Sequence, residues 1–358
     1  YYMCMRIELP RFIRHHWLTV AFVCGFISDL ILLNRIDDVI DNLVLLFYVV
    51  LATMSLIVFY AAIAERFGEW WSHKLYQITQ LTLPYALGGL FSGMLIFYGR
   101  SGDIIASWPF LVFIIGAILG NELIRDRGRR LVFNVLAYFV GLFSYLVLVV
   151  PVLTGYLGAW VFVGTGLIAL AIVYGVILVL ARIIPHYMQL EMRHMVFMIF
   201  GTFVTLNGLY FMNLIPPIPL SLKELVIVQS VIRFPDTGQY ELKYEEIPWW
   251  NIMAQTRPTI HPTGSGVSCF SNVFAPAKIA TDIYHQWDLY NEAEGKWQER
   301  FRYAYPITGA ATDGYRGYTT TNNYQSGKWR CSVKSERGQL LGHKVFYIDT
   351  SEAPGELT

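Results

Sequence analysis

The sequence predicts a multi-domain protein, in which an α-helical transmembrane bundle of about seven helices is followed by an all-β, immunoglobulin-like sandwich. Of its 358 residues, 55% are hydrophobic and 15% are charged, whereas soluble domains carry about 25% charged residues. The charges are also unevenly spread, with 24 in residues 1–220 and 29 in residues 221–358. We therefore expect a membrane domain over 1–214, a proline-rich linker over 215–222 and a β domain in water over 223–358.

Seven apolar stretches are long enough to cross a bilayer, whose ~30 Å hydrocarbon core takes roughly 20 helical residues. The first stretch follows basic residues, as a signal peptide does, but it lacks a small-residue cleavage site and is interpreted as a retained helix. Charged or helix-breaking residues separate the others. The expected spans are 17–33, 40–64, 75–98, 104–123, 131–153, 159–183 and 195–214.

Lysine and arginine in the short flanks predict the orientation of these spans. Counted on alternate sides of the expected helices, 11 of these residues fall on the side of the N-terminus and two on the other. Cytoplasmic loops are the ones enriched in Lys and Arg. We therefore expect a cytoplasmic N-terminus, and an odd number of spans places residues 215–358 on the outer side.

Four polar residues lie within or at the ends of the expected spans: Asp29, Glu122, Asn134 and Asn207. Burying such groups in hydrocarbon costs several kcal/mol, which makes each of them a candidate functional residue. One interpretation of the two carboxylates is a proton or ion relay. The other is placement near the membrane surface, with Glu122 paired to Arg125 on the same helix face. For the two asparagines we expect hydrogen bonds between helices.

Gly89 and Gly93 form a small-xxx-small pair in the third expected span. Small residues at this spacing let two helices approach closely. The pattern leaves two alternatives open, which are packing between helices of one chain and oligomerisation.

No catalytic residue, metal ligand set or cofactor is predicted. The sequence contains no GxSxG, Walker-type or HExxH motif, which are the common signatures of serine hydrolases, nucleotide-binding loops and zinc peptidases.

The chain leaves the last expected span through Pro216, Pro217 and Pro219, which favour an extended exit. Apolar residues then recur with a period of two, the spacing of a half-buried strand. Short alternating runs separated by Gly, Asn and Ser turns indicate an antiparallel sandwich. The residues expected to share a face within each strand are 226, 228 and 232; 267, 269, 271 and 273; 283, 285 and 287; and 329, 331 and 333.

Five ordered motifs characterise this half: SNVFAP at 271–276, IYHQW at 283–287, GYRGY at 314–318, GKWR at 327–330 and GQLLG at 338–342. Together they resemble the domain of unknown function 2914. That domain is found at the C-terminus of polytopic bacterial membrane proteins. The resemblance implies a β-sandwich and no activity. Combined with the orientation expected above, it leads us to expect the β-sandwich in the periplasm of a bacterium, anchored in the inner membrane.

Cys269 and Cys331 both lie in the exported half, on the expected inward faces of their strands. An oxidising compartment permits a disulfide, and facing strands of a sandwich can come within reach of one another. The alternative is two buried free thiols.

His285, Asp313 and Ser271 supply the residue types of a catalytic triad, but their spacing is arbitrary. Because His285 shares a face with Trp287, we interpret it as a core or sheet-surface residue. His285 and Trp287 are at most candidates for partner binding.

Arg316 lies between Gly314 and Gly317 and beside Tyr315 and Tyr318. An arginine flanked by aromatic rings can stack on them and bind a carboxylate or a sugar, so one interpretation is a ligand-binding loop. The other is a salt bridge between loop and strand with aromatic cover.

Two functions remain open on the sequence. The first is a non-catalytic accessory subunit that presents the β domain to a membrane-protein complex, a second copy of itself or an envelope glycan. The second is a transporter or membrane enzyme with its site among the helices and the β domain as a regulatory lid. The exported half has 14 basic and 15 acidic residues, which argues against nucleic-acid binding.

Overall fold

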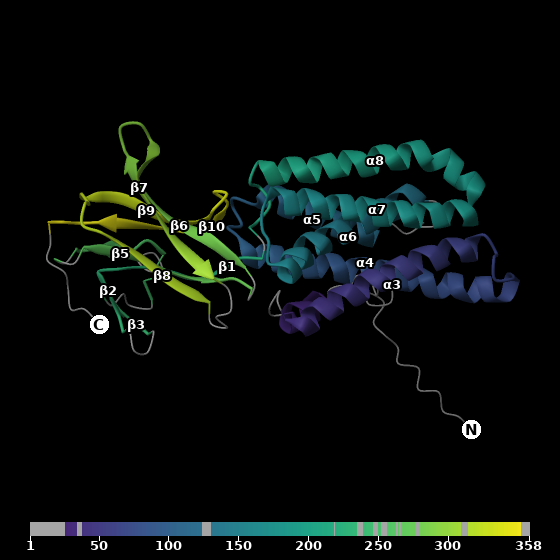
Figure 1. Cartoon of the computed structure of the whole chain (residues 1–358), viewed down its shortest axis with the longest axis horizontal. Coiled ribbons are helices and arrows are strands. Elements are labelled where there is room, and N and C mark those ends of the chain that lie inside the picture. Colours follow the sequence, from purple (N-terminus) through teal and green to yellow (C-terminus); the bar gives the residue numbers. More distant parts are fainter. Residues whose placement is uncertain are drawn as a thin grey trace, which may run out of the picture. The chain divides into compact units, whose positions relative to one another are not determined.

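The structure is a computed structural model in which helices precede strands along the chain (Figure 1). It describes residues 26–33, 38–123, 130–217, 219–234, 239–245, 250–251, 256–262, 264, 266–276, 279–308 and 314–351. Contacts divide the chain into two compact units, which we describe separately. The first unit comprises residues 1–97, 111–149 and 163–208, and the second comprises 98–110, 150–162 and 209–358.

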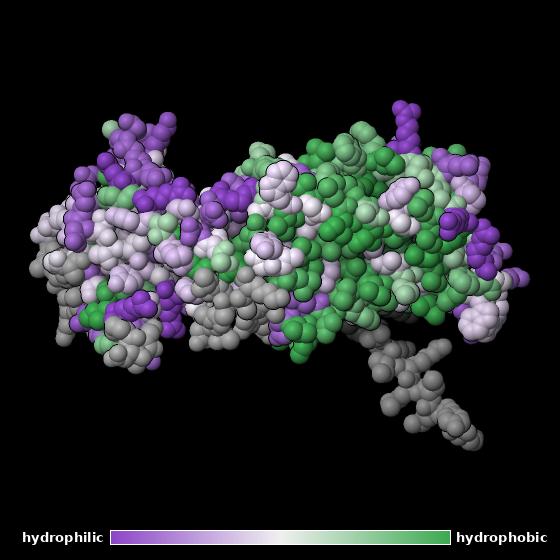
Figure 2. All heavy atoms as spheres, in the orientation of Figure 1, coloured by the Kyte–Doolittle hydropathy of each residue, from purple (hydrophilic) through white to green (hydrophobic). Residues whose placement is uncertain are grey.

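The described part of the chain has seven helical segments, the number that the sequence predicts. Five of them are long and apolar enough to cross a membrane, and hydrophobic residues dominate the visible surface of the helices (Figure 2). The exceptions are residues 26–32, at the end of the first expected span, and the 16-residue α5. The labelled helices are α3 (Val39–Ile63), α4 (Glu69–Ser101), α5 (Trp108–Leu123), α6 (Leu131–Thr154), α7 (Ala159–Ile183) and α8 (Pro185–Phe211).

Local capping explains where several helices begin. The Asp38 carboxylate accepts a hydrogen bond from the backbone N–H of Ile40 at 3.0 Å, and α3 starts directly after it. α8 begins at Pro185, ten residues before the expected span, because proline is well tolerated in a first helical turn. α5 begins four residues late, since Asp103 accepts bonds from the N–H groups of two residues in the preceding turn.

Gly89 and Gly93 allow α4 to approach α3 within one chain. A Cβ atom at Gly89 would lie 2.6 Å from the Tyr48 ring, and one at Gly93 would lie 2.7 Å from Leu45. Both distances are far below van der Waals contact. The structure therefore uses this small-residue pair for packing inside the bundle.

The strands form two main sheets and a separate hairpin. One sheet has the order β1 (Ser221–Val228), β5 (Val267–Phe274), β8 (Tyr315–Thr321). The other has the order β4 (Thr259–Ile260), β10 (Leu340–Ile348), β9 (Gly327–Ser335), β6 (Ala280–Asn291), β7 (Lys296–Thr308). β2 (Ser230–Arg233) and β3 (Tyr240–Lys243) form the hairpin. The pairings are antiparallel except that of β10 with β4, which is parallel.

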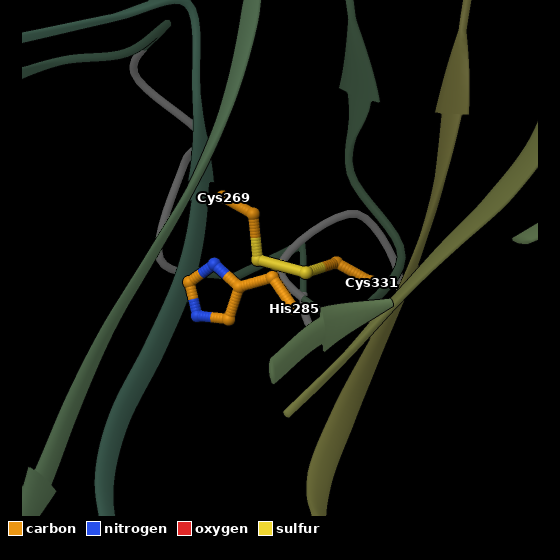
Figure 3. Close-up of side chains that lie close together, drawn as sticks. All are labelled: Cys269, His285 and Cys331. Carbon is orange, nitrogen blue, oxygen red and sulfur yellow. A yellow bond between two sulfur atoms is a disulfide. The ribbon is translucent and has the colours of Figure 1, made fainter. Parts of the chain in front are cut away.

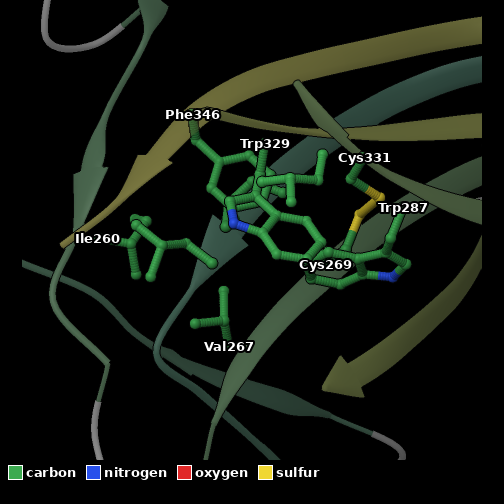
Figure 4. Packing of buried hydrophobic residues seen from close by; sticks show 10 residues of the cluster. Ile260, Val267, Cys269, Trp287, Trp329, Cys331 and Phe346 are labelled. Atoms are coloured by element: carbon green, nitrogen blue, oxygen red, sulfur yellow. A yellow bond between two sulfur atoms is a disulfide. The ribbon is translucent and has the colours of Figure 1, made fainter. Parts of the chain in front are cut away.

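Apolar side chains from both sheets fill the space between them (Figure 4). Trp287 from β6 meets Phe346 from β10 edge to face, with their ring centroids 5.9 Å apart. Ile227 and Val267 contribute to the same cluster from the opposite sheet. The expected inward faces of β5, β6 and β9 are the faces that line this core.

Two strand expectations need correction. Residues 226, 228 and 232 do not lie in one strand, because the chain leaves the sheet after Val228 and Ile232 belongs to the β2–β3 hairpin. The motif at 314–318 is not a loop, since Arg316 lies inside β8 and pairs with Asn272 of β5. Backbone pairing with β5 outweighs the poor strand propensity of Gly317.

Candidate functional site

A disulfide and a histidine lie together in the core of the β domain (Figure 3). The structure contains the Cys269–Cys331 bond, which joins β5 of one sheet to β9 of the other across a Cα–Cα distance of 6.6 Å. The two sulfur atoms and a ring nitrogen of His285 lie within 4.8 Å of one another. Because the sulfurs are bonded to each other, they are not the thiolates that a metal site of this composition requires.

His285 is the centre of a buried polar network. Its Nε2 lies 2.8 Å from the Ser271 hydroxyl, and its Nδ1 lies 3.0 Å from the Thr319 hydroxyl. The Tyr305 hydroxyl lies 2.6 Å from that of Ser271, and Trp287 Nε1 donates to Thr319 Oγ1 at 3.1 Å. Burial lowers the pKa of His285 to about 3 and raises that of Tyr305. The imidazole is therefore neutral at neutral pH.

This network contains a serine and a histidine in hydrogen-bond contact, but it does not have the arrangement of a nucleophilic site. Both residues have no solvent-exposed surface, and the second ring nitrogen meets a threonine hydroxyl where a triad has a carboxylate. Asp313, the third member considered above, lies outside the described residues. We interpret the network as a polar connection that satisfies hydrogen-bonding groups between the two sheets.

Arg316 and Tyr318 lie on the outer face of β8, and Tyr315 lies on the other face against the core. The two glycines beside Arg316 have different roles. Gly314 has a φ of +91° before the strand starts, a conformation that favours glycine. Gly317 is inside the strand, where a Cβ atom would lie 2.5 Å from the Tyr305 ring.

The β2–β3 hairpin completes a surface around Arg316, which we call the β8 patch: Arg233, Tyr240, Arg316 and Tyr318. The Tyr240 ring lies 6.1 Å from that of Tyr318 and edge-on to it. Its hydroxyl donates to the Arg316 carbonyl at 3.3 Å, and the Arg233 guanidinium lies 5.9 Å from its ring centroid. Sequence reasoning missed Arg233 and Tyr240 because about 80 residues separate them from β8.

The polar residues of the helices mostly make contacts between helices. Asp29 is buried and accepts hydrogen bonds from Ser92 of α4 and, at 3.5 Å, from Tyr48 of α3. Asn134 of α6 donates to the Tyr60 hydroxyl of α3 at 2.8 Å.

The prediction that Asn207 bonds to another helix is wrong. Its amide donates to the Phe203 carbonyl one turn earlier in α8, a local bond open to a short polar side chain in a helix. The side chains of Glu122 and Arg125 lie outside the described part of the chain.

The comparisons with known proteins identify part of the β domain. Residues 280–348, which run from the start of β6 to the end of β10, match the family described as "Protein of unknown function (DUF2914)". No curated protein matches this chain. A solved structure of Pseudomonas fluorescens alkylpurine DNA glycosylase AlkC bound to DNA aligns with 88% of this chain and 100% of its own, at 10% identity and a TM-score of 0.23. That score is too low to support a common fold.

Proposed function

We propose that this chain, which carries a domain of the DUF2914 family, is a non-catalytic accessory protein of the bacterial inner membrane. Its N-terminus is cytoplasmic, and its β domain is presented in the periplasm to a partner complex or an envelope glycan. The Lys/Arg asymmetry of the flanks supports this orientation. The observation that carries the proposal is the β8 patch, where two arginines and two tyrosines gather on the outer surface of β8 and the neighbouring β2–β3 hairpin.

The chemistry of the β8 patch suits a binding surface. Tyrosine and arginine are enriched among the residues that dominate binding energy at interfaces. Arg316 has its backbone held by β5 and by Tyr240, while its guanidinium group faces solvent and can bind a carboxylate with two parallel hydrogen bonds. The Ser271–His285 pair, by contrast, is closed to any substrate.

Co-purification of the full chain from native membranes after mild crosslinking tests this function. We expect a stoichiometric partner with the wild type, and its loss in Arg316→Ala/Tyr318→Ala. Arg300→Ala/Tyr303→Ala removes an exposed arginine and an exposed tyrosine from β7 instead, and this control should retain the partner. Equal capture by the two double variants, or capture of nothing by the wild type, would contradict the proposal.

A second candidate function, a proton-coupled transporter, is favoured by one observation. Asp29 is a buried carboxylate among hydroxyl groups of two other helices, and such residues mark proton or ion paths in membrane proteins. Proteoliposomes with an internal pH-sensitive dye separate the two functions. A transporter would show a proton flux that Asp29→Asn abolishes, whereas an accessory protein would show none.

A further inference from the structure

A second surface lies on the outer face of the five-stranded sheet, within the part that matches the family. Lys328, Arg330 and Lys334 lie along β9, two and four residues apart, on the face opposite to the core residues Trp329, Cys331 and Val333. Arg302 of β7 joins the same outer face, because it pairs with Gln286 in the strand between them. We call Arg302, Lys328, Arg330 and Lys334 the cationic face.

Aromatic rings of the sheet hold three of these cations in place. The Arg302 guanidinium lies 4.1 Å from the Tyr284 ring centroid, and that of Arg330 lies 4.5 Å from the Trp297 centroid. The Lys328 ammonium lies 4.9 Å from the Tyr290 centroid. Stacking of this kind limits side-chain motion and so lowers the entropy cost of binding. It also covers the rings that an uncharged sugar would use for stacking.

The acidic residues of this face do not balance its positive charge. Asp288 is 2% exposed and is saturated by Arg330, at 2.7 and 3.0 Å, and by the Gln286 amide, at 2.7 Å. Asp282 of β6, two residues before Tyr284, and Glu299 of β7 are the other acids on this face of the described strands. Four cations therefore face three carboxylates, although the exported half as a whole has one more acid than bases.

Lys334 is half-buried on this face. Its ammonium donates to Gln286 Oε1 at 2.7 Å, and burial lowers its pKa. A bound anion would offset that loss of hydration.

We propose that the cationic face binds a linear polysaccharide that carries carboxylate groups. The β9 cations form a row in which Lys328 and Arg330 are about 7 Å apart and Lys334 is about 14 Å beyond Arg330, because residues two apart on a strand are about 7 Å apart. Such a row fits an extended polymer with regularly spaced charges. Guanidinium and ammonium groups supply the hydrogen bonds that carboxylates accept. This inference goes beyond the proposed partner site, because the β8 patch belongs to the other sheet and to the hairpin.

Binding of fluorescein-labelled polygalacturonate to the full chain in detergent micelles, followed by anisotropy, tests the proposal. We expect saturable binding that weakens as salt is raised, because exposed charges are screened. A neutral glucan of the same length should not bind. Polyglutamate, polyphosphate and single-stranded DNA are the competing polyanions. If any of these binds more tightly than polygalacturonate, the assignment to a carboxylated polysaccharide is wrong.

Two matched variants show where the polymer binds. Arg302→Gln/Lys328→Gln removes two charges from the cationic face, and we expect its Kd for polygalacturonate to rise roughly tenfold. Arg233→Gln/Arg316→Gln removes two charges from the β8 patch and should leave the Kd within about twofold of the wild type. Equal weakening in both would mean non-specific attraction and would overturn the proposal.

The folding control for these variants is amide exchange in β6 and β9, which should match the wild type. Partner capture reports on the β8 patch alone. Failure of polymer binding and failure of the proposed function are therefore distinguishable.

Discussion

At the scale of single residues, His285 shows how burial decides chemistry. Histidine beside serine is a common catalytic combination, but both ring nitrogens of His285 are bound to hydroxyl groups inside a closed core. An imidazole with a pKa of about 3 does not take up a proton at neutral pH, so it acts as a fixed hydrogen-bonding group. It satisfies the hydroxyl groups of Ser271 and Thr319 between the sheets, and Thr319 in turn accepts from Trp287.

We expect His285 to make the β domain sensitive to acid. Its pKa is about 3 in the folded state and 6.5 in its ordinary state, so both states are neutral above about pH 7. Below pH 6.5, His285 is protonated in the unfolded chain but stays neutral in the folded chain. The free energy of unfolding should then fall by up to about 1.4 kcal/mol per pH unit down to about pH 3.

Amide exchange of β6 in the full chain between pH 7 and pH 4.5 measures this effect. His285→Gln can keep the hydrogen bonds without titrating, and we expect it to show a shallower loss of protection. His186→Gln replaces an exposed histidine of α8 and should follow the wild type. Identical slopes for His285→Gln and the wild type would show that another group causes the acid sensitivity.

At the scale of elements, the helices and the sheets are held together by different means. α3 packs on α4 at two glycines and donates or accepts hydrogen bonds through Tyr48 and Tyr60. In lipid, close packing and hydrogen bonds between helices replace the hydrophobic effect. The sheets of the β domain instead bury apolar side chains, and the Cys269–Cys331 disulfide closes a loop of 62 residues between them. Such a crosslink stabilises a fold by about 4 kcal/mol in the chain-entropy estimate.

Gly89→Ala should weaken the packing of α3 on α4. The added Cβ atom would meet the Tyr48 ring, and overpacking of this kind costs roughly 1–3 kcal/mol. We expect a lower midpoint in thermal unfolding of the detergent-solubilised chain. Gly99→Ala, in the same helix but with nothing within 4 Å of the new atom, is the control and should not lower the midpoint. If Gly89→Ala changed only the oligomeric state, the glycine would face a second copy of the chain.

At the scale of the whole molecule, membrane orientation decides which surfaces meet which partners. The excess of Lys and Arg in the flanks on the side of the N-terminus, 11 against two, predicts that this side is cytoplasmic. Both proposed binding surfaces belong to the β domain. They can meet a periplasmic partner only if the β domain lies on the side of the membrane opposite to the N-terminus.

Reporter fusions measure this orientation directly. Alkaline phosphatase fused after residue 351 should be active, because the enzyme needs an oxidising compartment to form its disulfides. The same reporter inserted at residue 67, between α3 and α4, should be inactive. The reverse result would place the β domain in the cytoplasm and remove the basis for a periplasmic partner.

The sequence by itself determined the division into apolar helices and a β domain, and the inward faces of β5, β6 and β9. These features depend on local composition and on a period of two, which are properties of neighbouring residues. The observed helix starts differ from the predicted ones where a capping residue or a proline begins the helix, as at Asp38 and Pro185. The strand at Arg316 was not predicted, because its pairing with β5 is a long-range interaction.

Only the tertiary structure decided which residues of the candidate sites meet. β8 lies beside β5 and β6 lies beside β9, although neither pair is consecutive in the chain. Strand order depends on the packing of side chains far apart in sequence, so it brings Tyr240 to Tyr318 and Arg302 to the row on β9 without a local signal. The same packing closed Ser271 and His285 off from solvent and left the arginines of the two outer faces open to it.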